Sequence, residues 1–297
     1  MVKKSKIRGA EFQRRRTAPP HLFGPTDDRS WPGRAVGTVV IASEPRSGST
    51  LLAEALADSG FFGIPHEYLI YPEIGRARRD LGIPRPTLSQ RWRMPVRRIL
   101  GRPDWWALYD FRPDDLPRLV DEIVHRRTAA NGMFALKIHW RTYSMMSQRF
   151  GFDFDMLPQP IRWVHLERAD VVAQSVSFVK AQQTGVFGVR GPASTAIPSD
   201  PTYDDDVLVG AYVKMMAGRE GWRTFFSDCG ADTISVGYEE LRDNYAATVN
   251  RVAASLGWPL DRVPDPRLRR QADALSEEWA ERFRERHAHL VSDSQGP

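Results

Sequence analysis

The sequence predicts an α/β fold in which a parallel sheet is covered by helices on both faces. Short, mostly apolar segments alternate along the chain with segments of helical periodicity. At residues 39–52 an apolar segment leads through a tight polar loop directly into a helical segment. The chain has 297 residues, of which 41% are hydrophobic, so it is long enough to bury one large core. We therefore expect a P-loop-type parallel sheet flanked by helices.

Residues 1–34 are predicted to lie outside this fold, as a basic, disordered tail and linker. Lys and Arg dominate residues 1–20, where Glu11 is the only acidic residue, so the chain's net charge of +5 originates in this tail. Residues 17–34 are rich in Pro, Gly and Asp, as linkers are. Aromatic residues do not interleave with the basic ones as a base-stacking surface requires, which argues against a nucleic-acid partner. One domain is expected over residues 35–297.

Within that domain, the first strand is predicted at residues 36–43 and the first helix at residues 49–58, where Gly60 is typical of a helix end. Residues 84–103, rich in Arg, Pro and Trp, are expected to form an insertion over the sheet edge or the active site. Residues 184–206 predict a surface loop or a lid. The other predicted elements are strands at residues 133–140 and 161–166 and helices at residues 114–127, 170–182, 207–226, 245–256 and 276–287.

The loop after the first strand has the composition of a phosphate-binding site. The N–H groups of a first helical turn lack partners within the helix, and with the helix dipole they favour an anion. Arg46 adds a full positive charge, and Gly48 lets a ligand approach the backbone closely. Ser47, Ser49 and Thr50 offer hydroxyl donors. A plain connecting loop is the alternative, and the Gly-Lys-Ser/Thr triplet of nucleotide-triphosphatase loops is missing because Ser49 follows Gly48.

A second anion site is predicted after residues 161–166, because the carboxyl ends of parallel strands meet at one edge of a sheet. Arg168 lies just past this strand, and Asp170 is typical of the N-cap of the following helix. A serine two turns into the helix, Ser175 or Ser177, would place a hydroxyl toward the same crevice. The alternatives are a surface ion pair for Arg168 and a hydroxyl bonded to its own helix.

The first loop carries a family resemblance. The run Pro45-Arg46-Ser47-Gly48-Ser49-Thr50-Leu51 resembles the 5′-phosphosulfate loop of sulfotransferases that use 3′-phosphoadenosine 5′-phosphosulfate (PAPS), most closely that of the bacterial trehalose 2-sulfotransferase family. The resemblance implies the sulfotransferase fold, PAPS as co-substrate and adenosine 3′,5′-bisphosphate as product. Arg46 and the backbone donors from Ser47 to Leu51 would hold the phosphosulfate. Arg168 and Ser177 would hold the 3′-phosphate, because Ser-Val-Ser-Phe resembles the family's Ala-Val-Ser-aromatic run; Ser175 is the fallback.

The resemblance also implies catalytic residues. Arg46 would stabilise charge on the departing phosphate, without any metal or redox cofactor. Glu67, in Ile64-Pro65-His66-Glu67-Tyr68, occupies the position of the proposed glutamate base of the bacterial family. His139, in Lys137-Ile138-His139, resembles the histidine base of cytosolic sulfotransferases, where the bacterial family has methionine. Both remain candidates for the base that receives the acceptor's proton, and the closer family match favours Glu67.

The sequence therefore predicts a sulfotransferase that moves a sulfuryl group from PAPS to a hydroxyl of a carbohydrate or glycosylated small molecule. A kinase-like phosphotransferase and a non-catalytic nucleotide-binding module are the alternatives. The resemblance implies a sugar acceptor, with trehalose as the first candidate, and a homodimer. Cys229 is the only cysteine, and no run approaches about 18 apolar residues, so a cytoplasmic protein without a transmembrane segment is expected.

Overall fold

The computed structural model describes most of the predicted domain. The predicted tail before residue 28, nearly all of the segment 84–103 and the middle of the loop 184–206 lie outside the described residues. The described residues are 28, 33–85, 111–188, 200–268 and 273–293.

Four parallel strands form the sheet, in the order β2-β1-β3-β4. They are β1 (Gly37–Ser43), β2 (Met133–His139), β3 (Ile161–Glu167) and β4 (Thr233–Gly237). Ser43, at the end of β1, is paired with His139 on one side and with Leu166 on the other. This register brings the carboxyl ends of the three strands to one edge, as expected for a parallel sheet.

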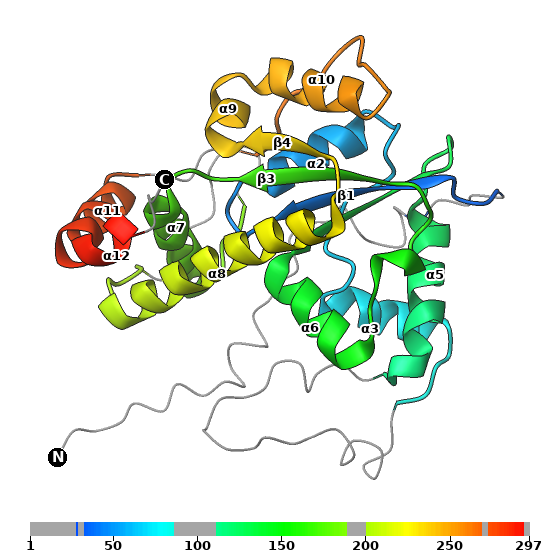
Figure 1. Ribbon diagram of the computed structural model, residues 1–297, viewed down its shortest axis with the longest axis horizontal. Helices are drawn as coiled ribbons and strands as arrows, with labels where there is room; N and C mark the ends of the chain where they lie inside the picture. Colours follow the sequence, from blue (N-terminus) through cyan, green and yellow to red (C-terminus); the bar gives the residue numbers. More distant parts are fainter. Residues whose placement is uncertain (1–27, 29–32, 86–110, 189–199, 269–272, 294–297) are drawn as a thin grey trace.

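Helices cover both faces of the sheet (Figure 1). Val39 and Ile41 of β1 pack toward α2 and α10, whereas Val40 and Ala42 pack in the opposite core. Because both faces of β1 are buried, its residues form the continuous apolar run seen in the sequence. The first face is covered by α2 (Ser49–Asp58), α9 (Tyr238–Asp243) and α10 (Tyr245–Ser255), and the second by α3 (Tyr71–Asp80), α5 (Leu116–Arg127), α6 (Trp140–Phe150) and α8 (Asp205–Cys229).

A third cluster of buried side chains extends beyond the carboxyl edge of the sheet. Here α7 (Val171–Thr184) packs against α8 and α11 (Ala274–Arg286), and α12 (Ala288–Asp293) follows. Val176, Leu208 and Phe283 are fully or almost fully buried in it. This cluster fixes α7 beside the loops of the predicted crevice. Within the described residues, no helix is long and apolar enough to cross a membrane.

The predicted α/β fold with a parallel sheet is confirmed, and its differences from the structure have local causes. Trp140, expected to end the second strand, is instead the first residue of α6. Its N–H group donates to Glu44 Oε1 at 3.0 Å, so the carboxylate of the first loop marks this helix start. The sequence does not predict α3, α6, α9, α12 or β4. Only Val236 of β4 is buried, so this strand lacks the apolar pattern of the other three.

Candidate active site

The first predicted anion site is the loop between β1 and α2. Arg46 has a positive φ of 65°, and Gly48, with a φ of 88°, is the N-cap of α2. Glycine has no side chain with which to cap a helix, so the first-turn N–H groups of Ser49, Thr50 and Leu51 stay available to a ligand. Together with the helix dipole, N–H groups of this kind favour an anion.

The three hydroxyls expected in this loop have different surroundings. Ser47 is fully buried, and its Oγ atom has no hydrogen-bond partner among the described residues. Ser49 is buried as well. Thr50 is half-buried and accepts a hydrogen bond from Lys137 Nζ at 3.0 Å. Of the three side chains, only that of Thr50 is therefore exposed enough to contribute its hydroxyl directly to a ligand.

Helix α7 presents one of its two candidate serines to the loop. Arg46 Nε donates to Ser177 Oγ at 2.9 Å, and Arg46 Nη1 donates to the carbonyl of Phe187. Ser175 is buried, and its hydroxyl donates to the carbonyl of Val171 in its own helix at 2.8 Å. The geometry thus favours Ser177 over the fallback Ser175 as the serine of the crevice.

Arg168 reaches the same place from the end of β3. Its Nη1 lies 3.5 Å from the carbonyl oxygen of Arg46, and Asp170 caps α7 by accepting from the Ala173 N–H at 2.9 Å. Burial and the neighbouring charge of Arg168 lower the pKa of Arg46, and burial lowers the pKa of Arg168. Two neighbouring positive charges of this kind favour an anionic ligand. The two predicted anion sites therefore form one region.

Tyr238, the first residue of α9, joins these two sites and was missed in the sequence. The guanidinium carbon of Arg168 lies 4.7 Å from the centre of the Tyr238 ring. A Cβ atom at Gly48 would come within 2.7 Å of the same ring, so only glycine fits there. No periodic pattern marks Tyr238, because it follows the weakly apolar strand β4.

The candidate bases lie on the other side of the loop, at the end of β2. Glu67 Oε1 lies 3.2 Å from His139 Nε2 and 3.0 Å from Lys137 Nζ. Lys137 also donates to Thr50 at 3.0 Å, which connects this cluster to the first turn of α2. His139 Nδ1 lies 3.0 Å from the carbonyl oxygen of Ser43. The structure therefore brings Glu67 and His139 into direct contact.

This contact sets the charges of both groups. Burial would raise the pKa of Glu67, but His139 and Lys137 outweigh it and hold that pKa well below its usual range. Burial likewise opposes the charged imidazole, yet Glu67 raises the pKa of His139 above its usual value. Both ring nitrogens of His139 face oxygen acceptors, Ser43 O and Glu67 Oε1, which fits an imidazolium with two donors.

Glu44 is a further buried acid that the sequence did not single out. It is 7% exposed, and burial raises its pKa to about 7, although His139 and the Trp140 N–H act in the opposite direction. Gly218 of α8 packs against it so closely that a Cβ atom there would come 2.2 Å from the carboxyl carbon. No pattern in the sequence around Glu44, Pro45 and Arg46 predicts a buried acid, because Glu44 is buried by α8, which lies far away along the chain.

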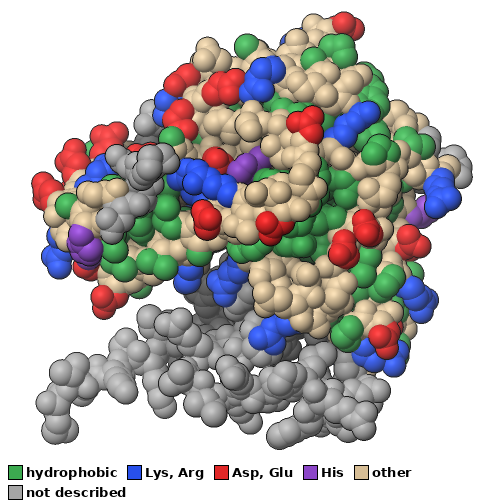
Figure 2. Space-filling view, in the orientation of Figure 1, with side chains coloured by type: hydrophobic (Ala, Val, Ile, Leu, Met, Phe, Trp, Pro, Cys, Tyr) green, Lys and Arg blue, Asp and Glu red, His purple; other side chains and the backbone are tan. Residues whose placement is uncertain are grey.

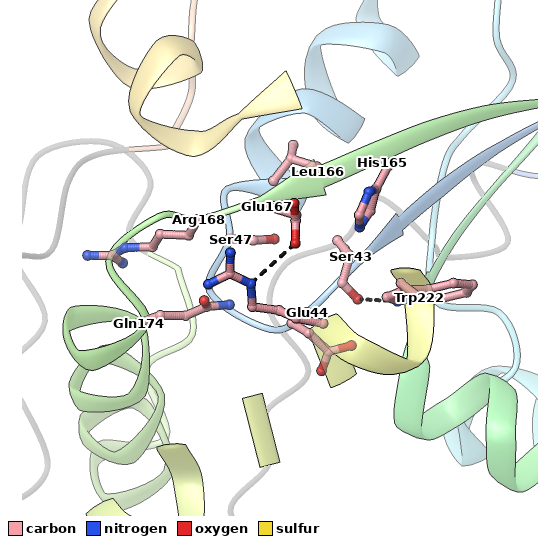
Figure 3. Close-up of a pocket in the computed structure, with 10 residues that line it drawn as sticks. Ser43, Glu44, Ser47, His165, Leu166, Glu167, Arg168, Gln174 and Trp222 are labelled. Atoms are coloured by element: carbon pink, nitrogen blue, oxygen red, sulfur yellow. Dashed lines mark hydrogen bonds and ion pairs between the residues drawn. The ribbon is translucent and has the colours of Figure 1, made fainter. Parts of the chain in front are cut away.

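A small cavity lies behind the loop, between the ends of β1 and β3 and helices α7 and α8 (Figure 3). Gln174 extends from α7 toward it, and Glu44 and Trp222 line another side. Charged groups also surround it: Arg219 Nε donates to Glu167 Oε1 at 3.2 Å. In Figure 2, basic, acidic and histidine side chains gather on the surface where β3 ends near α8.

Within the described part of the chain, no group of three or more His, Cys, Asp or Glu side chains is arranged to hold a metal ion. The donor set of the crevice consists instead of guanidinium groups, hydroxyls and backbone N–H groups. Such donors suit phosphate and sulfate oxygens.

Comparisons with known proteins agree with this chemistry. Residues 38–286 match the family described as Stf0 sulphotransferase. The trehalose 2-sulfotransferase of Mycolicibacterium smegmatis is 30% identical over 261 residues, which cover 83% of this chain and 93% of that protein. The trehalose 2-sulfotransferase of Mycobacterium tuberculosis is 30% identical over 281 residues, which cover 84% of this chain and 96% of that protein.

Among solved structures, the sulfotransferase domain of the Synechococcus PCC 7002 olefin synthase is similar with a TM-score of 0.45 and 17% sequence identity, covering 86% of this chain and 90% of that chain. The family match extends over most of the chain and includes both the loop and the segment around Arg168. The chain belongs to the Stf0 sulphotransferase family.

Proposed function

We propose that this protein transfers a sulfuryl group from PAPS to a hydroxyl group of a sugar or glycosylated small molecule. The observation that carries the proposal is the meeting of two anion-binding elements. Arg46, from the loop after β1, donates to Ser177 of α7 at 2.9 Å, and Arg168 lies against the backbone of Arg46. A donor with phosphates at both the 5′ and the 3′ position matches a region with two such elements.

The donor would be held at two ends. Arg46 and the first-turn N–H groups of α2 would bind the 5′-phosphosulfate, because backbone donors and the helix dipole favour anionic oxygens. Arg168 and Ser177 would bind the 3′-phosphate. The Tyr238 ring supports one side of the Arg168 guanidinium and so fixes its direction. PAPS differs from ATP in this 3′-phosphate, so the second element would supply selectivity between the two.

Arg46 would also promote transfer. Negative charge accumulates on the departing phosphate as the sulfuryl group leaves, and a cation held at that point lowers the barrier. Burial and the charge of Arg168 disfavour the charged form of Arg46 in the free protein. A negative charge that develops beside Arg46 would offset this cost, and the attraction between the two charges would be stronger in this buried place than in water.

For the base, the contacts favour Glu67. His139 directs both ring nitrogens at protein oxygens, whereas the ion pairs that Glu67 makes with described residues both involve Oε1. Oε2 would then receive the acceptor's proton. His139 would act through Glu67, by keeping it ionised and oriented.

The acceptor class follows from the relatives, since two trehalose 2-sulfotransferases match most of the chain. We propose trehalose as the first compound to test. Mass spectrometry of an incubation with PAPS and trehalose would reveal a sulfated disaccharide, and a panel of other sugars serves as the control for acceptor specificity.

Donor selectivity is tested separately by thermal denaturation with adenosine 3′,5′-bisphosphate, with ADP, and with ATP plus Mg²⁺. A ligand that binds the native state raises the melting temperature, and the added stability grows with the logarithm of the ligand concentration divided by its Kd. Preferential stabilisation by the 3′-phosphorylated compound supports the proposal. Selective stabilisation by ATP with Mg²⁺ would instead favour a kinase-like phosphotransferase, and nucleotide binding without turnover would favour a binding module.

A further inference from the structure

Helix α7 contacts the phosphate loop at two points one turn apart. Besides the bond between Arg46 and Ser177, Gln174 Nε2 donates to the carbonyl oxygen of Pro45 at 2.8 Å. Gln174 is 1% exposed, so this second contact lies in the interior rather than in the crevice. The two contacts hold the residues on either side of the peptide bond between Pro45 and Arg46.

The conformation at Arg46 needs such support. A positive φ is unfavourable for a residue with a side chain and persists only where surrounding contacts fix it. On the opposite side of the loop, α8 approaches closely, because Gly218 leaves no room for even a Cβ atom beside Glu44. The loop is therefore held between α8 and the amide of Gln174.

Gln174 also lines the cavity behind the loop. Gln174, Ser47 and Arg168 all line this cavity. Each has one buried polar atom with no hydrogen-bond partner among the described residues: Gln174 Oε1, Ser47 Oγ and Arg168 Nε. The first is an acceptor, the second is a hydroxyl, and the third is a donor. The cavity is small, close to the minimum size that holds one water molecule.

We propose that Gln174 is a positioning residue, which fixes the phosphate loop through Pro45 and connects that loop to Arg168 through one internal water. This inference rests on the proposed function of the loop as a phosphosulfate site. Gln174 does not touch the ligand. It sets the distance between the element that binds the 5′ end of the donor and the element that binds its 3′ end.

The test compares Gln174→Met with Ser175→Ala, its neighbour on the same helix. Methionine keeps the length of the side chain and removes the amide oxygen and nitrogen. Ser175 is the matched control, because its hydroxyl donates to the carbonyl of Val171 within α7. We expect Gln174→Met to weaken binding of adenosine 3′,5′-bisphosphate, measured by calorimetry well below the melting temperature, about 10-fold. Ser175→Ala should bind within about twofold of wild type.

Two readouts separate positioning from a loss of overall stability. Hydrogen exchange of peptides covering residues 43–51 should accelerate in Gln174→Met without ligand, while peptides from β2 exchange as in wild type. In turnover assays, the KM for PAPS should rise and the KM for the sugar should not. Equal rises in both values, or unchanged exchange in the loop, would overturn the positioning role.

The connection through the cavity is tested by combining Gln174→Met with Ser47→Ala. If one water joins the two side chains, each single variant already removes the shared interaction. The fold-loss of affinity for adenosine 3′,5′-bisphosphate in the double variant is then smaller than the product of the fold-losses in the two single variants. A loss equal to that product would overturn the shared water. Wild-type protein that does not bind adenosine 3′,5′-bisphosphate would overturn the proposed function itself, whereas unchanged affinity in Gln174→Met overturns only the role of Gln174.

Discussion

The two sides of the phosphate loop differ in how they arrange charge. On the side of β3 and α7, two positive charges are neighbours, because the Arg168 guanidinium lies against the Arg46 backbone and the charge of Arg168 lowers the pKa of Arg46. On the side of β2, opposite charges meet, because Glu67 contacts both His139 and Lys137. Like charges in proximity reduce the stability of the native protein, whereas the second cluster is compensated internally.

This difference assigns the two sides different tasks. A region that gathers positive charge gains free energy when a phosphorylated ligand binds, which suits the donor nucleotide. A compensated cluster needs no ligand and can hold a carboxylate ionised and oriented for proton transfer. Variants on the first side should therefore change nucleotide affinity, and variants on the second side should change turnover alone.

The largest effect is expected at Glu67. Glu67→Gln removes the proposed base while keeping the shape of the side chain, so kcat should fall by about 10² to 10⁴. The affinity for adenosine 3′,5′-bisphosphate should stay unchanged, since Glu67 belongs to the compensated side. Steady-state kinetics and calorimetry measure the two quantities.

The matched control is Glu278→Gln on α11, which changes an exposed carboxylate far from the loop in sequence. It should leave both kcat and affinity at the wild-type values. If Glu67→Gln retains full turnover while substitution of His139 abolishes it, the His139 imidazole is the base, and Glu67 is the residue that orients it.

Arg46 should show the next largest effect. Arg46→Ala removes the cation from the departing phosphate, and kcat should fall by about 10² to 10³. Arg46→Lys should recover part of this loss, because it restores the charge without the fork of donors. Single-turnover rates at saturating PAPS separate this effect from binding; a rate within twofold of wild type for Arg46→Ala would remove Arg46 from the transfer step.

Glu44, between the two sides, should give the smallest effect, on stability rather than rate. Its folded pKa of about 7 exceeds the usual 4.5, so its contribution to the free energy of unfolding is full below about pH 4.5 and is lost as the pH rises through 7. Glu44→Gln cannot ionise. Relative to wild type, it should therefore gain about 1–3 kcal/mol between pH 4.5 and pH 8.5.

Urea denaturation at the two pH values measures this gain. Asp228→Asn, at an exposed acid near the end of α8, is the control and should show no comparable pH dependence. If the difference in the free energy of unfolding between Glu44→Gln and wild type does not change with pH, Glu44 is ionised throughout this range. Its charge would then be compensated, like that of Glu67.

Local patterns in the sequence were sufficient for most of the sheet and for the first loop. The predicted helix at residues 49–58 has the observed bounds, because Gly48 and the apolar face of α2 are short-range signals. The approach of Arg168 to Arg46 follows from the parallel order of β1 and β3 and was also expected.

Other features depend on contacts between distant segments and left no local signal. Tyr238 is placed by β4, a short strand with little buried surface. Glu44 is buried because α8 carries Gly218 at the point of contact. The family resemblance favoured Glu67 over His139 as the base, but no local pattern predicted that the two side chains touch, beside the bridge between His66 and Leu136.

The central claim is that Arg46 and Arg168 bind opposite ends of one nucleotide. It is tested most directly by calorimetric titration of wild type and Arg168→Ala with adenosine 3′,5′-bisphosphate and with AMP, which lacks the 3′-phosphate. We predict that wild type prefers the bisphosphate by about 10- to 100-fold, as expected for charge-assisted hydrogen bonds, and that Arg168→Ala loses this preference while binding AMP as before. Equal affinity of wild type for the two compounds, or a preference that survives in Arg168→Ala, would contradict the account.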